Sequence, residues 1–154
     1  GTRWRPYPNG RTFAMRIAPD SFPYAAQNVV RGANRPDDWT NIWMSDMERG
    51  VPAWIELRWP RRISFNTVEI TFDTNANRRV TLPLSRYPEC VKDYHIECGD
   101  GGAMRDILRV EGNYERRRVH RFDRVTTDRL RLNVLATNGV NAARVYEVRV
   151  YDQA

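Results

Sequence analysis

The sequence has very little lysine, few cysteines and no long apolar run. Lys92 is the only lysine among 25 basic residues, so arginine carries nearly all of the positive charge behind the formal net charge of +6. No stretch approaches the roughly 20 apolar residues that a membrane-spanning helix needs, and no signal peptide is recognisable. We therefore expect no membrane span. A chain of 154 residues can bury one sizeable core without disulfides or metals.

The arginine bias has two interpretations. The simpler one is the codon usage of a GC-rich genome. The functional one is a surface suited to carboxylate or sulfate, because guanidinium groups pair with such anions bidentately. The arginines are spread along the chain and interleaved with Asp and Glu, and no nucleic-acid-binding motif occurs, so we expect no nucleic-acid partner.

The two cysteines, Cys90 and Cys98, are predicted to be free. The segment between them has the alternation of a strand, and eight extended residues span roughly 26 Å. A disulfide needs Cα atoms about 4.4–6.8 Å apart. Only His95 and His120 accompany these thiols, and neither lies at a zinc-ligand spacing, so no metal site is expected there.

Alternation with a period of two predicts an all-β protein. Leu130, Leu132 and Val134 point to one side of their strand, opposite Arg129, Arg131 and Asn133. Further strands are predicted over residues 54–59, 67–74, 94–98, 107–110, 119–122 and 145–151, with turn residues between them. This spacing favours an antiparallel β-sandwich over a βαβ fold. Core packing is the expected role of Trp43, Trp54 and Trp59.

The order of these features along the chain resembles one known family. Ala26–Gly32, Trp43–Asp46 and Pro52–Leu57 are followed by Tyr94-His-Ile-Glu and by Tyr146–Tyr151. The set is similar to the discoidin, or coagulation-factor type C, family of galactose-binding-like domains, which also serve as bacterial carbohydrate-binding modules. The resemblance implies an N-terminal extension over 1–11 and a discoidin-like jelly roll over 12–154. It also implies a sandwich of roughly eight strands with ligand loops at one end.

The resemblance places the ligand loops at 19–24, 44–50, 73–86, 113–117 and 137–141. Sugar recognition needs an aromatic face and planar polar groups. The candidates in these loops are Tyr24, Asp46, Arg49, Asn75, Arg78, Arg79, Asn113, Tyr114 and Asn138. The alternative for Asn113 and Asn138 is a purely local role as turn formers. Sugar-binding relatives commonly carry a histidine just after the tryptophan of the second loop, where this chain has Met44. The resemblance therefore does not identify which sugar is bound.

Sugar-binding relatives often hold a structural calcium near an Asp-Gly turn and a late glutamate. Here Arg31 takes the position of the aspartate before Gly32, whereas Glu147 keeps the acidic position. A guanidinium would repel the ion, which prefers several oxygen ligands. We therefore predict an ion pair between Arg31 and Glu147 and no required cofactor. Calcium stays an alternative, because neighbouring Asn and Asp residues offer oxygens.

Two functions follow from the resemblance and the residues. The first is a non-catalytic, monomeric carbohydrate-binding module of a larger bacterial glycan-active protein, secreted, periplasmic or at the cell surface. Its partners would be a glycan, for which the arginines favour an acidic one, and other domains of the parent protein. The second is a structural domain that packs against a neighbouring domain and binds no sugar. No enzyme is expected, since both histidines fall on strands and the Gly-rich turn 98–102 lacks the lysine and helix of a phosphate-binding loop.

Overall fold

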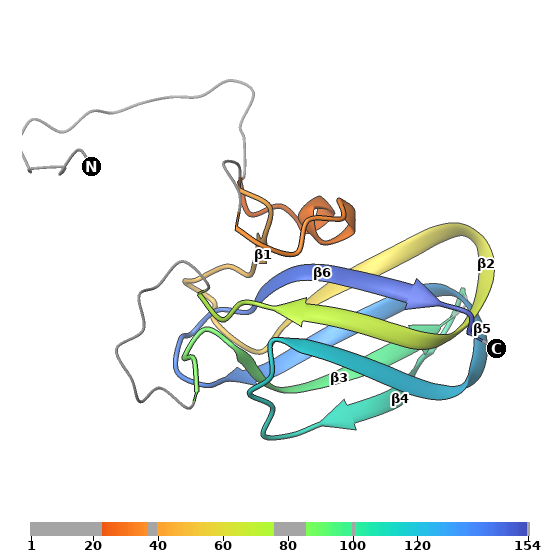
Figure 1. Cartoon of the computed structure of the whole chain (residues 1–154). Coiled ribbons are helices and arrows are strands. Elements are labelled where there is room, and N and C mark those ends of the chain that lie inside the picture. The colour runs from red at the N-terminus through yellow and green to blue at the C-terminus, as the bar shows by residue number, and fades with distance from the viewer. Residues whose placement is uncertain (1–22, 37–39, 76–85, 100, 154) are drawn as a thin grey trace, which may run out of the picture.

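The computed structural model describes residues 23–36, 40–75, 86–99 and 101–153. These residues form an antiparallel sheet of six strands, in the order β1-β6-β2-β5-β3-β4, that folds over itself into a sandwich (Figure 1). This confirms the predicted all-β fold. The elements are the 3-10 helix η1 (Ala26–Val30), β1 (Trp43–Met44), β2 (Ala53–Phe72), β3 (Val91–Gly99), β4 (Met104–Val110), β5 (Arg117–Thr137) and β6 (Arg144–Tyr151).

The two long strands β2 and β5, with 20 and 21 residues, each belong to both layers. Residues 53–58 of β2 pair with 129–134 of β5, which continues to β3 and β4. Residues 67–72 of β2 pair with β6 on one side, and residues 67–71 pair on the other side with 117–121 of β5. Between the two parts the register shifts at Arg58/Ile63, and Pro60, which has no N–H to donate, lies in this irregular stretch. The prediction of separate strands at 54–59 and 67–74 is therefore wrong, because a bulge and not a turn joins them.

The core lies between the two layers and is continuous. Phe65, Ile70, Phe72, Tyr94, Ile96, Leu130, Leu132 and Val134 are among its fully buried side chains. The predicted inward face of β5 is thus confirmed. Both cysteines are free and buried, as predicted. Burial raises the pKa of the Cys90 thiol to about 12 and that of the Cys98 thiol to about 11.

Strand β6 departs from simple alternation at its start. Val145, Tyr146, Glu147 and Val148 are all buried, and the core cluster includes Val145 and Val148, which are three positions apart. The register with β2 shifts at this point, where Thr71 pairs with Glu147 and Phe72 with Val145. Helix η1 packs against β6 and supplies Val29 to the core cluster. This packing explains why neighbouring side chains on both faces of β6 are buried. No helix in the described part of the chain is long and apolar enough to cross a membrane.

The strand directions give the sandwich two different ends. At the loop end, the strands meet the described loops 45–52, 86–90, 111–116 and 138–143. At the opposite end, β2 and β5 bend from one layer to the other near residues 58–63 and 123–129, beside the turn between β3 and β4. We call these the loop end and the bend end.

Candidate functional site

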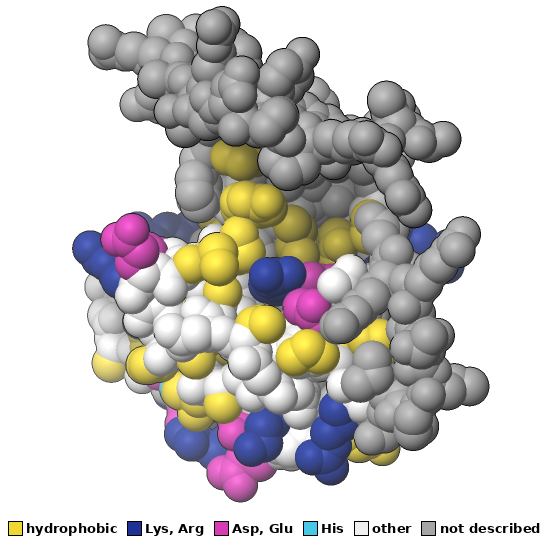
Figure 2. Space-filling view, turned by 90° about the vertical axis from the view of Figure 1, so that its left-hand side faces the viewer, with side chains coloured by type: hydrophobic (Ala, Val, Ile, Leu, Met, Phe, Trp, Pro, Cys, Tyr) yellow, Lys and Arg dark blue, Asp and Glu magenta, His cyan; other side chains and the backbone are white. Residues whose placement is uncertain are grey.

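Hydrogen bonds join the four described loops of the loop end to one another. The Asn138 amide donates to the Cys90 and Asn113 carbonyls, at 3.0 Å each. The Val140 N–H donates to the Pro88 carbonyl at 3.1 Å, and the Val51 N–H donates to Asn141 Oδ1 at 3.3 Å. The loop end is therefore a preformed rim and not a set of independent loops. Figure 2 looks onto this end, where charged side chains of both signs lie among hydrophobic ones.

Two of the predicted ligand residues hold this rim together. The Asn113 side chain is only 2% exposed. Its Nδ2 donates to the Val91 carbonyl at 2.7 Å and to the Glu115 carbonyl at 3.2 Å, while its Oδ1 accepts the Glu115 N–H. The side-chain amide of Asn138 is used in the same way, on backbone carbonyls. Both residues lie at the predicted end of the sandwich. Their side-chain amides bond segments 22 to 48 positions apart, so the role that these contacts show is structural, but it is not the purely local one of a turn former.

Asp46 and Arg49 line an open cavity of about 440 Å³ at the loop end. Asp46 Oδ1 accepts the Glu48 N–H at 2.8 Å, which fixes the turn, and its Oδ2 lies 3.5 Å from Arg49 Nε. Both side chains are exposed. Gly50 closes the turn with φ +72°, and a Cβ there would lie 2.2 Å from the Asn141 amide, so only glycine fits. Asp46 and Arg49, both predicted to bind the ligand, thus face a cavity, and hydrogen bonds fix the turn that carries them.

Trp54 forms one side of the same cavity and is 57% exposed. The prediction that it packs in the core is wrong. The Arg131 guanidinium carbon lies 4.7 Å from its ring centre, which is a cation–π geometry. Sequence alternation contained the signal for this: Trp54 lies on the same side of β2 as Glu56 and Arg58, opposite Ile55 and Leu57.

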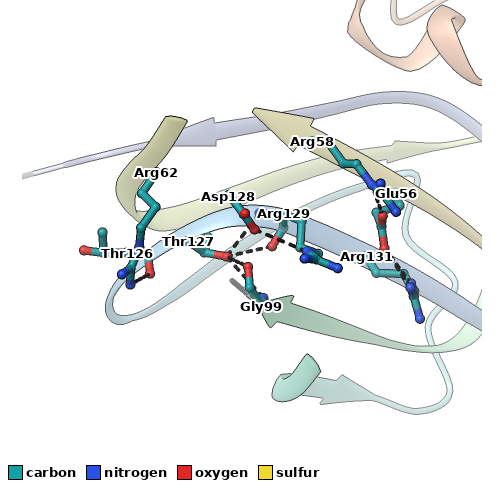
Figure 3. Close-up of polar contacts among 9 residues, drawn as sticks. All are labelled: Glu56, Arg58, Arg62, Gly99, Thr126, Thr127, Asp128, Arg129 and Arg131. Carbon is teal, nitrogen blue, oxygen red and sulfur yellow. Dashed lines mark hydrogen bonds and ion pairs between the residues drawn. The ribbon is translucent and has the colours of Figure 1, made fainter. Parts of the chain in front are cut away.

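Glu56 fixes the arginine that stacks on Trp54. Its Oε2 accepts two bonds from Arg131, at 3.0 and 2.7 Å, and Arg58 Nε lies 2.5 Å from its Oε1 (Figure 3). Burial raises the pKa of Glu56, but the hydrogen bonds from Arg58 and Arg131 outweigh this effect and hold it below its usual value. The carboxylate therefore stays charged, and Arg131 keeps its place beside the indole.

A second exposed aromatic residue lies at the loop end. Tyr114 is 54% exposed, and the Arg86 guanidinium carbon lies 6.0 Å from its ring centre. Tyr24 is half-buried, and its carbonyl accepts the Met44 N–H at 3.3 Å. Of the two predicted aromatic platforms, Tyr114 is thus the more accessible.

Asn75 lies over a buried polar group. Its Nδ2 donates to Glu89 Oε1 at 2.9 Å and its N–H to Asp73 Oδ1 at 2.7 Å, with a φ of 49°. Asp73 in turn lies 3.3 Å from Arg144 Nη1. This side chain therefore anchors the start of its loop. Arg78 and Arg79, also predicted to bind ligand, lie outside the described residues.

Glu147 is paired with Arg149, and not with Arg31 as predicted. Arg149 Nη2 lies 2.5 Å from Glu147 Oε1. It also lies 4.0 Å from the position that a Cβ atom would take if Gly32 were replaced by another residue. The two residues are two apart on β6, so their side chains share a face, whereas Arg31 is exposed at the end of η1. A guanidinium therefore lies at the turn where the family resemblance would place calcium, and a guanidinium does not offer the oxygen ligands that this ion prefers.

The two histidines have local partners. The Tyr94 hydroxyl and His120 Nε2 are 2.8 Å apart inside the core, which is the structural hydrogen bond expected of a buried histidine. His95 Nδ1 lies 2.5 Å from Asp106 Oδ1, and with Glu97 they are the only group of three potential metal ligands in the described part of the chain. Neither histidine hydrogen-bonds a serine or cysteine among those residues.

No family model and no curated protein matches this sequence. Solved structures do. The family 32 carbohydrate-binding module of Streptococcus pneumoniae EndoD matches with a TM-score of 0.70 and 17% identity, over 89% of this chain and 91% of that one. The family 32 module of Clostridium perfringens NanJ, in complex with galactose, matches with 0.64 and 13%, over 86% and 88%. The AlyQ module, in complex with 4,5-unsaturated mannuronic acid, matches with 0.62 and 11%, over 88% and 92%.

These similarities extend over nearly the whole described sandwich. The fold is therefore the discoidin-like β-sandwich of family 32 carbohydrate-binding modules, and the fold predicted from the resemblance is confirmed.

Proposed function

We propose that this chain is a non-catalytic carbohydrate-binding module that holds a glycan at its loop end. The observation that carries the proposal is the exposed indole of Trp54, fixed by Arg131 beside the cavity of Asp46 and Arg49. An aromatic face with adjacent charged groups is what recognition of a pyranose ring requires. The fold supports the same function, because the similar structures include modules in complex with sugars.

The proposed recognition is shallow and prearranged. The indole of Trp54 stacks on the apolar face of a sugar ring, Asp46 accepts hydrogen bonds from hydroxyl groups, and Arg49 donates them. Because hydrogen bonds already fix the rim, binding loses little further loop entropy. A micromolar to millimolar dissociation constant corresponds to about 4–8 kcal/mol. Tethering to a larger protein would raise the effective concentration of a catalytic partner.

An acidic glycan fits this rim best. Arg49 and Arg86 are exposed at the loop end, and guanidinium groups pair well with carboxylates. The AlyQ module, whose fold this chain shares, is in complex with an unsaturated uronic acid. We propose that the module is a monomer and part of a larger bacterial glycan-active protein outside the cytoplasm.

Replacing Trp54 by alanine is expected to weaken glycan binding tenfold or more, because truncating an aromatic residue at the centre of a binding site typically costs about 2 kcal/mol or more. Affinity electrophoresis against neutral and uronate polysaccharides, followed by calorimetry on the best ligand, measures the change. Trp54→Phe keeps an aromatic face and should retain most of the affinity. Affinity for an acidic ligand should also fall as ionic strength rises.

Two results would contradict this proposal. Unchanged affinity in Trp54→Ala would show that Trp54 does not contact the glycan. Tyr114→Ala would then test the other aromatic–arginine pair at the loop end. Absence of binding to every polysaccharide of both sets would count against the function itself. The stability of Trp54→Ala serves as the control, since an exposed side chain should change it by less than about 1 kcal/mol.

A role as a structural or protein-interaction domain is the second candidate. The exposed Met47 and Trp54 give the loop end apolar surface that a neighbouring domain could cover. In that case Met47→Asp would release the neighbouring domain from the module, and no polysaccharide would bind.

We further propose that the module needs no calcium. Hydrogen bonds with Tyr151 and Glu147 raise the pKa of Arg149, so its positive charge lies at the turn beside Gly32 at every ordinary pH. The expected result is that a chelator leaves the thermal midpoint unchanged and that elemental analysis finds no stoichiometric calcium. Arg149→Gln should be less stable, and calcium should not restore it. A tightly bound ion in the purified protein would refute this.

A further inference from the structure

Three side chains that can bind a metal ion lie together on the outer face of strands β3 and β4. His95 and Glu97 are two positions apart on β3, so their side chains share one face of the sheet. That face is the outer one, because Tyr94 and Ile96, which alternate with them, are fully buried in the core. Asp106 on β4 pairs with Glu97. One ligand atom from each of the three side chains lies within 4.8 Å of the other two.

A β-bulge brings Asp106 to this position. Ile96 pairs with Leu108, and the next residue, Glu97, pairs with Asp106. Ile107 is therefore an extra residue in β4, and it packs against the core cluster. Regular pairing would place Ile107 opposite Glu97 and turn the Asp106 carboxylate to the other face of the sheet. The bulge thus assembles the three potential ligands on one face.

The chemistry and spacing of these groups suit a divalent transition-metal ion. An imidazole nitrogen and two carboxylate oxygens are ligands that Zn²⁺ takes in sites with three protein ligands and one open position. His95 Nδ1 and Asp106 Oδ1 are now 2.5 Å apart. Two ligands of one tetrahedral zinc ion lie about 3.3 Å apart, because the zinc–ligand bonds are about 2.0–2.2 Å long. Asp106 is exposed, so its carboxylate can move by the small difference.

The two ligands on β3 are held in place by their surroundings. The side chains of His95 and Glu97 are only 15% and 20% exposed. Asn133 of β5, which pairs with His95, donates from Nδ2 to Glu97 Oε2 at 2.9 Å. Hydrogen bonds from neighbouring groups orient a metal-ligating carboxylate in this way. Binding of an ion therefore requires the ordering of Asp106 alone.

Two arginines face the cluster, and both can be reconciled with a bound cation. Arg109 Nη2 lies 3.8 Å from Asp106 Oδ2, and its side chain is 53% exposed, so it can turn into solvent. Arg131 Nη1 lies 3.9 Å from Glu97 Oε2. Its Nε and Nη2 donate to Glu56, which balances its charge. The two carboxylates of the cluster therefore remain to balance the double charge of the ion.

We propose that His95, Glu97 and Asp106 form a binding site for a divalent transition-metal ion, with Zn²⁺ as the ligand. The imidazole moves its Nδ1 proton to Nε2 and binds the ion through Nδ1, and water occupies the open position. Strand β4 is at the edge of the sheet (Figure 1). The ion joins this edge strand to β3 and stabilises the folded protein, because the unfolded chain does not hold the three ligands together.

The test uses the whole chain, treated with a chelator, and ZnCl₂ alone as the probe. Calorimetry should show one saturable site per chain. At about a hundredfold excess over the dissociation constant, Zn²⁺ should raise the thermal midpoint by about 5–10 °C. Mg²⁺ and Ca²⁺, which prefer oxygen ligands, should not. The ring nitrogens of His95 should shift in a nitrogen-15 spectrum, whereas those of the buried His120 should stay unchanged.

Four variants locate the ion. Asp106→Asn changes an exposed side chain and should weaken Zn²⁺ binding at least tenfold, whereas Asp123→Asn, with the same charge change at an exposed position of β5, should not. His95→Gln should weaken binding at least as much as Asp106→Asn. Arg109→Gln removes an opposing charge and should strengthen binding severalfold.

Several results would overturn the proposal. The absence of saturable binding of Zn²⁺ is one, and equal responses to Zn²⁺ and Mg²⁺ are another, because they would indicate screening of charge and not a built site. Equal weakening by Asp106→Asn and Asp123→Asn, or a shift of the His120 ring in place of the His95 ring, would place the ion elsewhere.

Discussion

Replacing Asn113 by alanine is expected to lower the free energy of unfolding by about 3 kcal/mol, because it leaves several buried backbone groups without partners. The Asn113 amide bonds the carbonyls of Val91 and Glu115, and its Oδ1 accepts the Glu115 N–H. None of these groups can reach water easily, since the side chain is almost completely buried. Urea unfolding followed by tryptophan fluorescence measures the change.

Two further variants sharpen this experiment. Asn113→Asp keeps the shape but replaces the donor with an acceptor, so it should destabilise at least as much as alanine. Tyr114→Ala changes the exposed neighbour and should cost less than about 0.5 kcal/mol. A loss of under 1 kcal/mol in Asn113→Ala would contradict the structural role.

The same variant separates the two roles considered for Asn113. A ligand-binding asparagine would lose glycan affinity at unchanged stability. A residue that holds the rim would lose stability first, and affinity would return toward the wild-type value at low temperature, where the fold is intact. The observed contacts predict the second pattern. Asn138, whose amide bonds the Asn113 carbonyl, should behave in the same way.

The sequence predicts the faces of the strands well, because one side of each strand must be buried. The inward residues Leu130, Leu132 and Val134 follow from alternation alone. So do the free cysteines, since extended chain keeps them apart. The length of the strands could not be predicted in this way. The composition of Trp59-Pro60-Arg61 is typical of a loop between two strands. Strand β2 nevertheless continues through these residues as a bulge, because it pairs with β5 both before and after them.

The candidate site likewise has some features that the sequence predicts and others that it does not. Alternation places Trp54 on the outer face, and only its residue type led to the expectation of core packing. The pairing of Glu147 with Arg149 depends on side-chain directions along β6, which the family resemblance does not specify. The hydrogen bonds among the loops join residues up to 90 positions apart, from Val51 to Asn141, and no local pattern predicts such a contact.

Lowering the pH should destabilise this protein through His120, which is buried against Tyr94. Burial, followed by the charge of Arg118, lowers the pKa of His120 to about 4. In the unfolded chain the imidazole has its ordinary pKa near 6.5. Below about pH 6.5 the unfolded state therefore binds a proton that the folded state does not. The contribution of His120 is complete above that pH and is lost as the pH falls toward 4.

The expected loss is about 3 kcal/mol between pH 7.5 and pH 4, relative to a variant without the histidine. His120→Gln is the matched control, because it can still bond the Tyr94 hydroxyl but does not titrate. Carboxylates contribute equally to both proteins, so the difference between their urea unfolding curves isolates the imidazole. The His120 ring resonances should also show no titration between pH 7.5 and 5. Parallel pH dependence in the two proteins would show that His120 gains its proton as readily in the core as in water.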